Sequence, residues 1–215
     1  AAAAAGVPEA RLVDLALYAP QWASPVEEAL GWPGLADGVL WLHAHTKDRQ
    51  WSVDAELRDS WAAQTAERTP LSADDLVDGA VDVDWFRRAH AALGADRWAV
   101  LHKAAKHASS GTGHRRAQLY AGAMLGTLTP GELRSKVTGQ RDQDAVRALG
   151  LLPLPAGDTE REAATADRYA VLRAFEQGSK AFGAQRQASE RTAARIGVAN
   201  LARTAGYPDP LRFTW

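Results

Sequence analysis

Basic side chains surround a short Ser/Gly turn at residues 102–116, between two stretches with helical patterning. Backbone N–H groups at a Gly-rich helix start, with arginine and histidine beside them, can hold a phosphate or a carboxylate. The turn matches neither of the common Gly-rich phosphate motifs, GxxxxGK before Ser or Thr and GxGxxG after a strand. The alternative is an ordinary interhelix turn with solvated cations. The predicted anion-binding residues are Lys103, Lys106, His107, Ser109, Ser110, Gly111, Thr112, Gly113, His114, Arg115 and Arg116.

The other histidines and the acidic residues form no recognisable catalytic or metal-binding motif. His43 and His45 are two residues apart, and His102 and His107 are five apart, so neither pair shares a helix face well. The sequence contains neither HExxH nor GxSxG. Its paired aspartates are typical of helix starts. We therefore predict no catalytic residue, no metal and no cofactor.

The composition is that of a globular protein with an uneven distribution of charge. The chain has 215 residues, of which 46% are hydrophobic and 24% charged. Residues 1–100 carry 16 acidic and 8 basic side chains, whereas residues 101–215 carry 10 and 17. This split indicates solvated helix faces, an acidic face docked on a basic one, or a basic face left for a polyanion. Because cysteine, a signal peptide and a long apolar stretch are missing, we expect a cytoplasmic chain without a membrane partner.

Tryptophan is unusually common, with eight in the chain and seven of these in the first 100 residues. Tryptophan is enriched both in cores and at binding hot spots. Trp41 and Trp85 have apolar neighbours in sequence and are expected in the core. Trp22 and Trp32 flank a Ser-Pro helix start and are predicted to be partly exposed, as a possible interaction surface.

Helix start and stop signals occur along most of the chain. The stretch from Thr129 to Glu132 is a capping box with proline at the first helical position. Strict alternation of apolar and polar residues, the mark of half-buried strands, does not stand out. We predict an all-α fold, a multi-helix array with little or no β-sheet. An α-solenoid and an irregular bundle are the two arrangements this pattern allows.

A proline-rich stretch suggests where domains divide. Residues 151–157 cannot be helical through their prolines, so we predict a helical domain at 1–150, a linker at 151–157 and a long helical segment at 158–215. One helix of about 47 residues would be about 70 Å long. We therefore expect a break near residues 178–183, where two glycines lie, or a role in a larger assembly. Because the chain stops one turn into a new helix that starts at Asp209, we expect it to continue in a longer protein.

Three stretches resemble one group of proteins. Residues 17–46, 101–126 and 200–215 are similar to the large bacterial proteins labelled molybdate metabolism regulator (MolR)-like, within their C-terminal domain of unknown function. The resemblance covers about residues 12–215. It implies a larger bacterial protein, and it supplies no catalytic residues to carry over.

These observations favour a non-enzymatic interaction or scaffold module of a larger cytoplasmic bacterial protein, with a possible regulatory role. Its expected partner is the rest of its own longer chain or another protein. The first alternative is phosphate or nucleic-acid binding by the basic turn, which predicts affinity that falls steeply with salt. The second alternative is part of an enzyme whose site is completed elsewhere in the longer protein.

Overall fold

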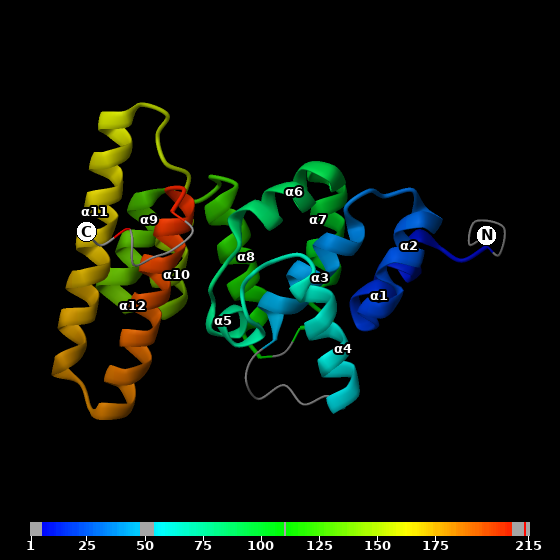
Figure 1. Ribbon diagram of the computed structural model, residues 1–215, viewed down its shortest axis with the longest axis horizontal. Helices are drawn as coiled ribbons and strands as arrows, with labels where there is room; N and C mark the ends of the chain where they lie inside the picture. The colour runs from blue at the N-terminus through cyan, green and yellow to red at the C-terminus, as the bar shows by residue number, and fades with distance from the viewer. Residues whose placement is uncertain (1–5, 48–53, 110, 208–212, 214–215) are drawn as a thin grey trace. The chain divides into compact units, whose positions relative to one another are not determined.

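The structure is a computed structural model that describes residues 6–47, 54–109, 111–207 and 213 (Figure 1). The described secondary structure is helical and contains no strand, which confirms the predicted all-α multi-helix array. Ser110 and the predicted helix from Asp209 onward lie outside or largely outside the described residues.

The chain divides into two compact units. Unit 1 comprises residues 1–77 and 84–117, and unit 2 comprises residues 78–83 and 118–215. The helices that lie mainly in unit 1 are α1 (Glu9–Tyr18), η2 (Pro20–Trp22), α2 (Ala23–Leu30), α3 (Leu35–Thr46), α4 (Ala55–Ala66), α5 (Ala73–Asp78), α6 (Val83–Leu93) and α7 (Ala95–Ala104). Helix α8 (Gly113–Met124) begins in unit 1 and ends in unit 2. Unit 2 also contains α9 (Pro130–Ser135), η3 (Lys136–Gln140), α10 (Gln143–Leu149), α11 (Asp158–Gly178), η4 (Ser179–Ala181) and α12 (Ala184–Thr204).

Helix α3 is the central element of unit 1. Its sequence is apolar on nearly all sides, which is typical of a helix surrounded by others, and most of its side chains are buried. Trp41 is fully buried and lies 4.9 Å from the ring of Phe86 and 5.7 Å from the ring of Trp98. Trp85 is also fully buried, so the two tryptophans expected in the core are there. Tilted and edge-to-face aromatic packing of this kind adds to the stabilisation from buried area.

Unit 2 is built on an antiparallel pair of long helices. Helix α12 packs against both α11 and α10 (Figure 1). The predicted break at 178–183 is confirmed, because α11 ends at Gly178 and α12 begins after Gly183. Helix α10 approaches α12 closely where Gly150 meets Gly197, since a Cβ on Gly150 would lie 2.4 Å from the carbonyl oxygen of Gly197. Only glycine allows the two backbones to approach this closely.

A short segment at residues 78–83 belongs to unit 2 although the chain on both sides of it belongs to unit 1. Asn200, fully buried on α12, holds it in place. The Asn200 side chain accepts a hydrogen bond from the backbone N–H of Val81 at 3.0 Å and donates one to the carbonyl oxygen of Gly79 at 3.2 Å. The backbone of this segment is thereby paired without regular secondary structure.

The stretch at 151–157, predicted to link two domains, lies within unit 2 and joins α10 to α11. Its first two residues, Leu151 and Leu152, are buried. The guanidinium of Arg168 donates hydrogen bonds to the carbonyl oxygens of Leu152 at 2.6 Å and Pro153 at 2.9 Å. The chain is therefore not helical through its prolines, as expected, and Arg168 on α11 satisfies the carbonyl groups of Leu152 and Pro153.

Candidate anion-binding site at the turn between α7 and α8

The turn between α7 and α8 is held by its neighbours in unit 1. Helix α7 ends at Ala104 and α8 begins at Gly113. The Tyr18 hydroxyl donates a hydrogen bond to the carbonyl oxygen of His107 at 3.0 Å, and the ammonium of Lys47 donates one to the carbonyl oxygen of Ala108. The Ser109 hydroxyl donates to the carbonyl oxygen of Ala105 at 2.6 Å, so it closes the end of α7.

The start of α8 lies against the backbone of α3. A Cβ on Gly113 would lie 2.0 Å from the carbonyl oxygen of Thr46, and Gly113 is buried. The Thr46 carbonyl group thus lies where the Cβ of any other residue would be. The glycine therefore serves the close packing of α8 against the end of α3.

Arg116 contacts three backbone carbonyls. Its Nε donates to the oxygen of His45 at 3.1 Å, its Nη1 to that of Val77 at 3.0 Å and its Nη2 to that of Lys47 at 2.6 Å. These charge-assisted hydrogen bonds satisfy orphan acceptors near the ends of α3 and α5. The structure thus assigns Arg116 to holding unit 1 together, which differs from its expected place in an anion site.

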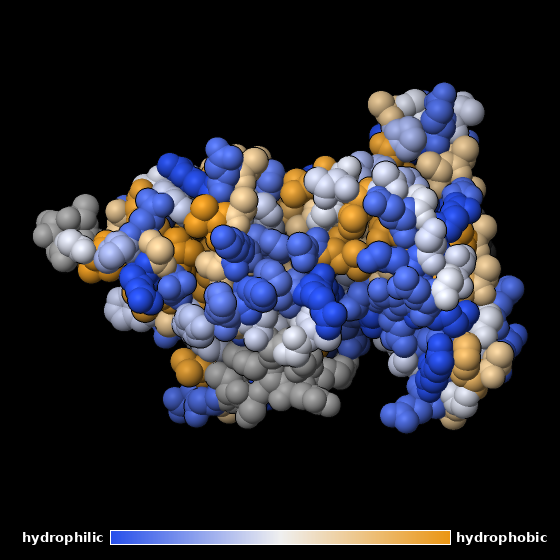
Figure 2. All heavy atoms as spheres, turned by 180° about the vertical axis from the view of Figure 1, so that it is seen from behind, coloured by the Kyte–Doolittle hydropathy of each residue, from blue (hydrophilic) through white to orange (hydrophobic). Residues whose placement is uncertain are grey.

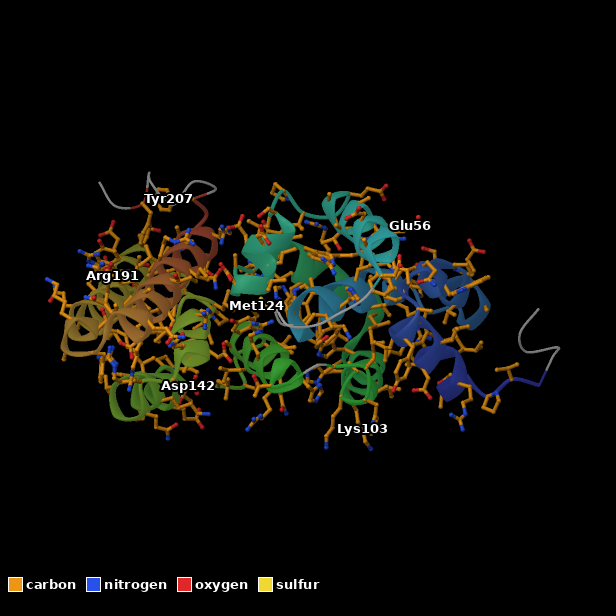
Figure 3. All side chains as sticks on the ribbon, turned by 90° about the horizontal axis from the view of Figure 1, so that it is seen from below. Glu56, Lys103, Met124, Asp142, Arg191 and Tyr207 are labelled. Carbon is orange, nitrogen blue, oxygen red and sulfur yellow. The ribbon has the colours of Figure 1, made fainter. Side chains whose placement is uncertain are left out.

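Three of the predicted cations remain exposed: Lys103, Lys106 and Arg115. None of them has a hydrogen bond or ion pair with another described residue. Lys103 extends away from the ribbon near the end of α7 (Figure 3). We call these three residues the α7–α8 basic patch. The exposed His107, Gly111 and Thr112 lie beside it in the chain.

Two histidines stack beneath the turn, a pairing that the sequence did not indicate. The rings of His102 and His114 lie 4.9 Å apart at an interplanar angle of 28°. Burial, followed by the charge of His114, lowers the pKa of His102 to about 4. The pKa of His114 is lowered by burial and by the charges of Lys106 and His107. Both rings therefore favour the neutral form at pH 7, and the lysines and Arg115 provide the charge of the patch.

The two tryptophans proposed as an interaction surface differ in exposure. Trp22 is 52% exposed, as expected. Trp32 is only 6% exposed, which corrects the prediction that it is partly exposed. The guanidinium of Arg97 lies 5.3 Å from the centre of its ring, so a cation–π contact covers one side of this tryptophan. Apolar side chains reach the visible surface among hydrophilic ones elsewhere too (Figure 2).

The described residues contain neither a metal-ligand cluster nor a membrane-spanning helix. Within them, no group of three or more histidine or acidic side chains could hold a metal ion. No helix in the described part of the chain combines the length and apolar character that crossing a bilayer requires.

Comparison with known proteins places the chain in a family without assigning it an activity. Residues 1–215 match the model of a family described as a family of unknown function (DUF5724). No curated protein and no solved structure matches the chain.

Proposed function

For this chain, which belongs to the DUF5724 family, we propose a non-enzymatic interaction module that contacts the phosphates of a nucleic acid through the α7–α8 basic patch. The observation that carries the proposal is the exposure of Lys103, Lys106 and Arg115 without a carboxylate partner among the described residues. Unpaired cations on and beside one turn attract a polyanion. The side chains of Tyr18 and Lys47 hold that turn in place.

The expected contacts are electrostatic and do not depend on the base sequence of the nucleic acid. Arg116 is engaged with backbone carbonyls, so the two lysines and Arg115 are the cations left to contact a phosphate backbone. Such contacts are independent of base sequence, and they release counterions. Three phosphate contacts predict that affinity for duplex DNA falls about 40-fold between about 50 and about 200 mM salt.

Fluorescence anisotropy with labelled duplex and single-stranded oligonucleotides tests the proposal. We compare the wild type with K103Q/K106Q/R115Q, and use R11Q/R87Q/K180Q as a control that removes the same charge from exposed sites elsewhere. The patch variant is expected to lose the salt-dependent affinity, whereas the control keeps most of it. Equal losses in the two variants, or no binding by the wild type, would contradict the proposal.

We also propose the kind of protein that contains this module. The resemblance to MolR-like proteins supports a module within a larger, cytoplasmic bacterial protein, with a possible regulatory role. A pull-down from bacterial lysate with and without nuclease separates a nucleic-acid partner from a protein partner. Nuclease is expected to release whatever is retained through the α7–α8 basic patch.

A further inference from the structure

Unit 2 contains a groove along the surface of its long helical hairpin. A cavity of about 540 Å³ lies between α11 and α12. Its floor is apolar, because Leu172 and Ala194 are buried there and Val198 is half-buried beside them. We call this the α11–α12 groove. An apolar floor open to the surface is typical of a site that receives apolar side chains from a ligand or a partner.

The rim of the groove is basic. Arg191 and Arg195 are exposed on α12 and form no hydrogen bond or ion pair with a described residue. Across the groove on α11, Arg173 pairs with Glu176. The charged residues that line the groove are these three arginines and one glutamate, a net charge of +2.

The acidic residue of α12 itself is not available to these arginines. Glu190 is 1% exposed in its side chain and accepts hydrogen bonds from Arg141 and Arg186. Its charge is therefore compensated inside unit 2, whereas the charges of Arg191 and Arg195 face the groove and solvent. A ligand that complements the groove must bring its own carboxylates.

We propose that the α11–α12 groove binds an acidic amphipathic helix of a partner protein. Arg191 and Arg195 are one helical turn apart, about 6 Å along the axis. Carboxylates at positions i and i+4 of a partner helix have the same spacing, and a neighbouring apolar stripe of that helix would rest on Val198 and Ala199. A nucleic acid matches the rim but leaves the apolar floor without a partner. The inference is independent of the α7–α8 basic patch.

Selection from a displayed peptide library tests the partner chemistry. The probes are helical peptides of roughly 16 residues with a fixed apolar stripe and charged positions that vary between Glu and Lys. On the full chain, Glu at i and i+4 is expected to be enriched about tenfold over Lys. With R191E/R195E the preference should reverse to Lys. The absence of enrichment, or the same preference with both proteins, would overturn the proposal.

Two further variants separate the groove from other surfaces. Val198→Gln removes apolar contact at a half-buried position and keeps both arginines, so it should weaken the selected peptide about fivefold or more. K103Q/K106Q/R115Q should bind that peptide as the wild type does. Unchanged affinity in Val198→Gln, or lost affinity in the patch variant, contradicts binding in the groove.

Competition by an oligonucleotide that depends on Arg191 and Arg195 would instead assign the groove to nucleic acid. Circular dichroism confirms that each variant folds.

Discussion

Each unit contains a partly buried arginine that donates several hydrogen bonds, but the acceptors differ between the two units. In unit 1, Arg116 donates to three backbone carbonyls. In unit 2, Arg141 donates to both carboxylate oxygens of Glu190, at 3.0 and 2.5 Å, and lies 4.3 Å from the centre of the Phe175 ring. Both arginines tie together segments that are distant in sequence, but within the described part of the chain only Arg141 has its charge compensated by a carboxylate.

The two kinds of acceptor have different consequences for the pKa values of neighbouring titratable groups. The charge of Arg116 adds to burial in lowering the pKa of His45, to about 3. In unit 2 the hydrogen bond from Arg141 lowers the pKa of Glu190, and the same pair raises the pKa of Arg141. Carbonyl acceptors thus fix an arginine in place and leave its field to act on nearby histidines, whereas a carboxylate largely cancels that field.

The largest expected effect is at the compensated arginine. Glu190→Gln leaves the guanidinium of Arg141 without an anion among buried neighbours, so we expect the free energy of unfolding to fall by about 3 kcal/mol or more. Urea unfolding measures this loss. Glu176→Gln, which removes the half-buried partner of the exposed Arg173, is the control and should cost less than about 1 kcal/mol. Similar losses in both variants would remove the distinction between the two ion pairs.

At the uncompensated arginine we expect a smaller loss. Arg116→Ala removes the donors to three carbonyls, and it should reduce the free energy of unfolding by about 2 kcal/mol. Its neighbour Arg115 is exposed, and Arg115→Ala should change stability by less than about 0.5 kcal/mol. Chemical denaturation of the two single variants checks this. A neutral Arg116→Ala would show that its backbone contacts contribute little to unit 1.

The destabilisation caused by replacing a closely packed glycine with alanine should be larger where the added Cβ would lie closer to its neighbour. A Cβ would lie 2.0 Å from the Thr46 oxygen at Gly113 in unit 1, and 2.7 Å from the Val146 oxygen at Gly197 in unit 2. We expect Gly113→Ala and Gly197→Ala each to destabilise the protein by roughly 1–3 kcal/mol, the first more than the second. Thermal unfolding provides the comparison. Gly131→Ala is the control, since nothing lies within 4 Å of its Cβ position; a comparable loss there would point to backbone effects instead.

The last expected effect is a dependence of stability on pH, and it is small over any single pH unit. Because the pKa of buried His45 is about 3 in the folded protein and about 6.5 when unfolded, the unfolded state takes up its proton first as pH falls. The stability associated with neutral His45 is complete above pH 6.5 and is lost as pH falls toward 3. His45→Leu should reduce the slope of unfolding free energy between about pH 6 and 5 by about 1 kcal/mol per pH unit. Equal slopes in the variant and the wild type would contradict this.

In unit 2, the contribution of Glu190 to stability is lost over a lower pH range than that of His45 in unit 1. Its lowered pKa means that its contribution is complete above the pKa of the unfolded carboxyl group, and is lost only as pH falls through the still lower folded pKa. Histidine-dependent loss in unit 1 therefore begins at higher pH than carboxylate-dependent loss in unit 2.

Local signals in the sequence predicted much of the fold. The Thr129 hydroxyl and Glu132 form the expected capping box, and the glycines at 178 and 183 mark the break between α11 and α12. These features depend on residues within one turn of each other, so sequence spacing determines them.

The candidate site was less predictable because it depends on packing. Arg115 and Arg116 are adjacent in sequence, but consecutive side chains on a helix point about 100° apart. Which one faces α3 depends on how α8 docks. The stacking of His102 on His114 likewise depends on how the turn closes. The burial of Trp32 likewise involves a residue far away in sequence, because Arg97 lies over one face of its ring.

The hydrogen bonds of Asn200 also set an order of events during synthesis. Val81 leaves the ribosome 119 residues before the side chain that will hold it. At typical elongation rates that interval lasts roughly 6 to 24 s. For this time the apolar residues at 80, 81 and 83, buried in the finished protein, have no partner from α12. The newly made chain can therefore complete the packing of this segment only after α12 has been translated.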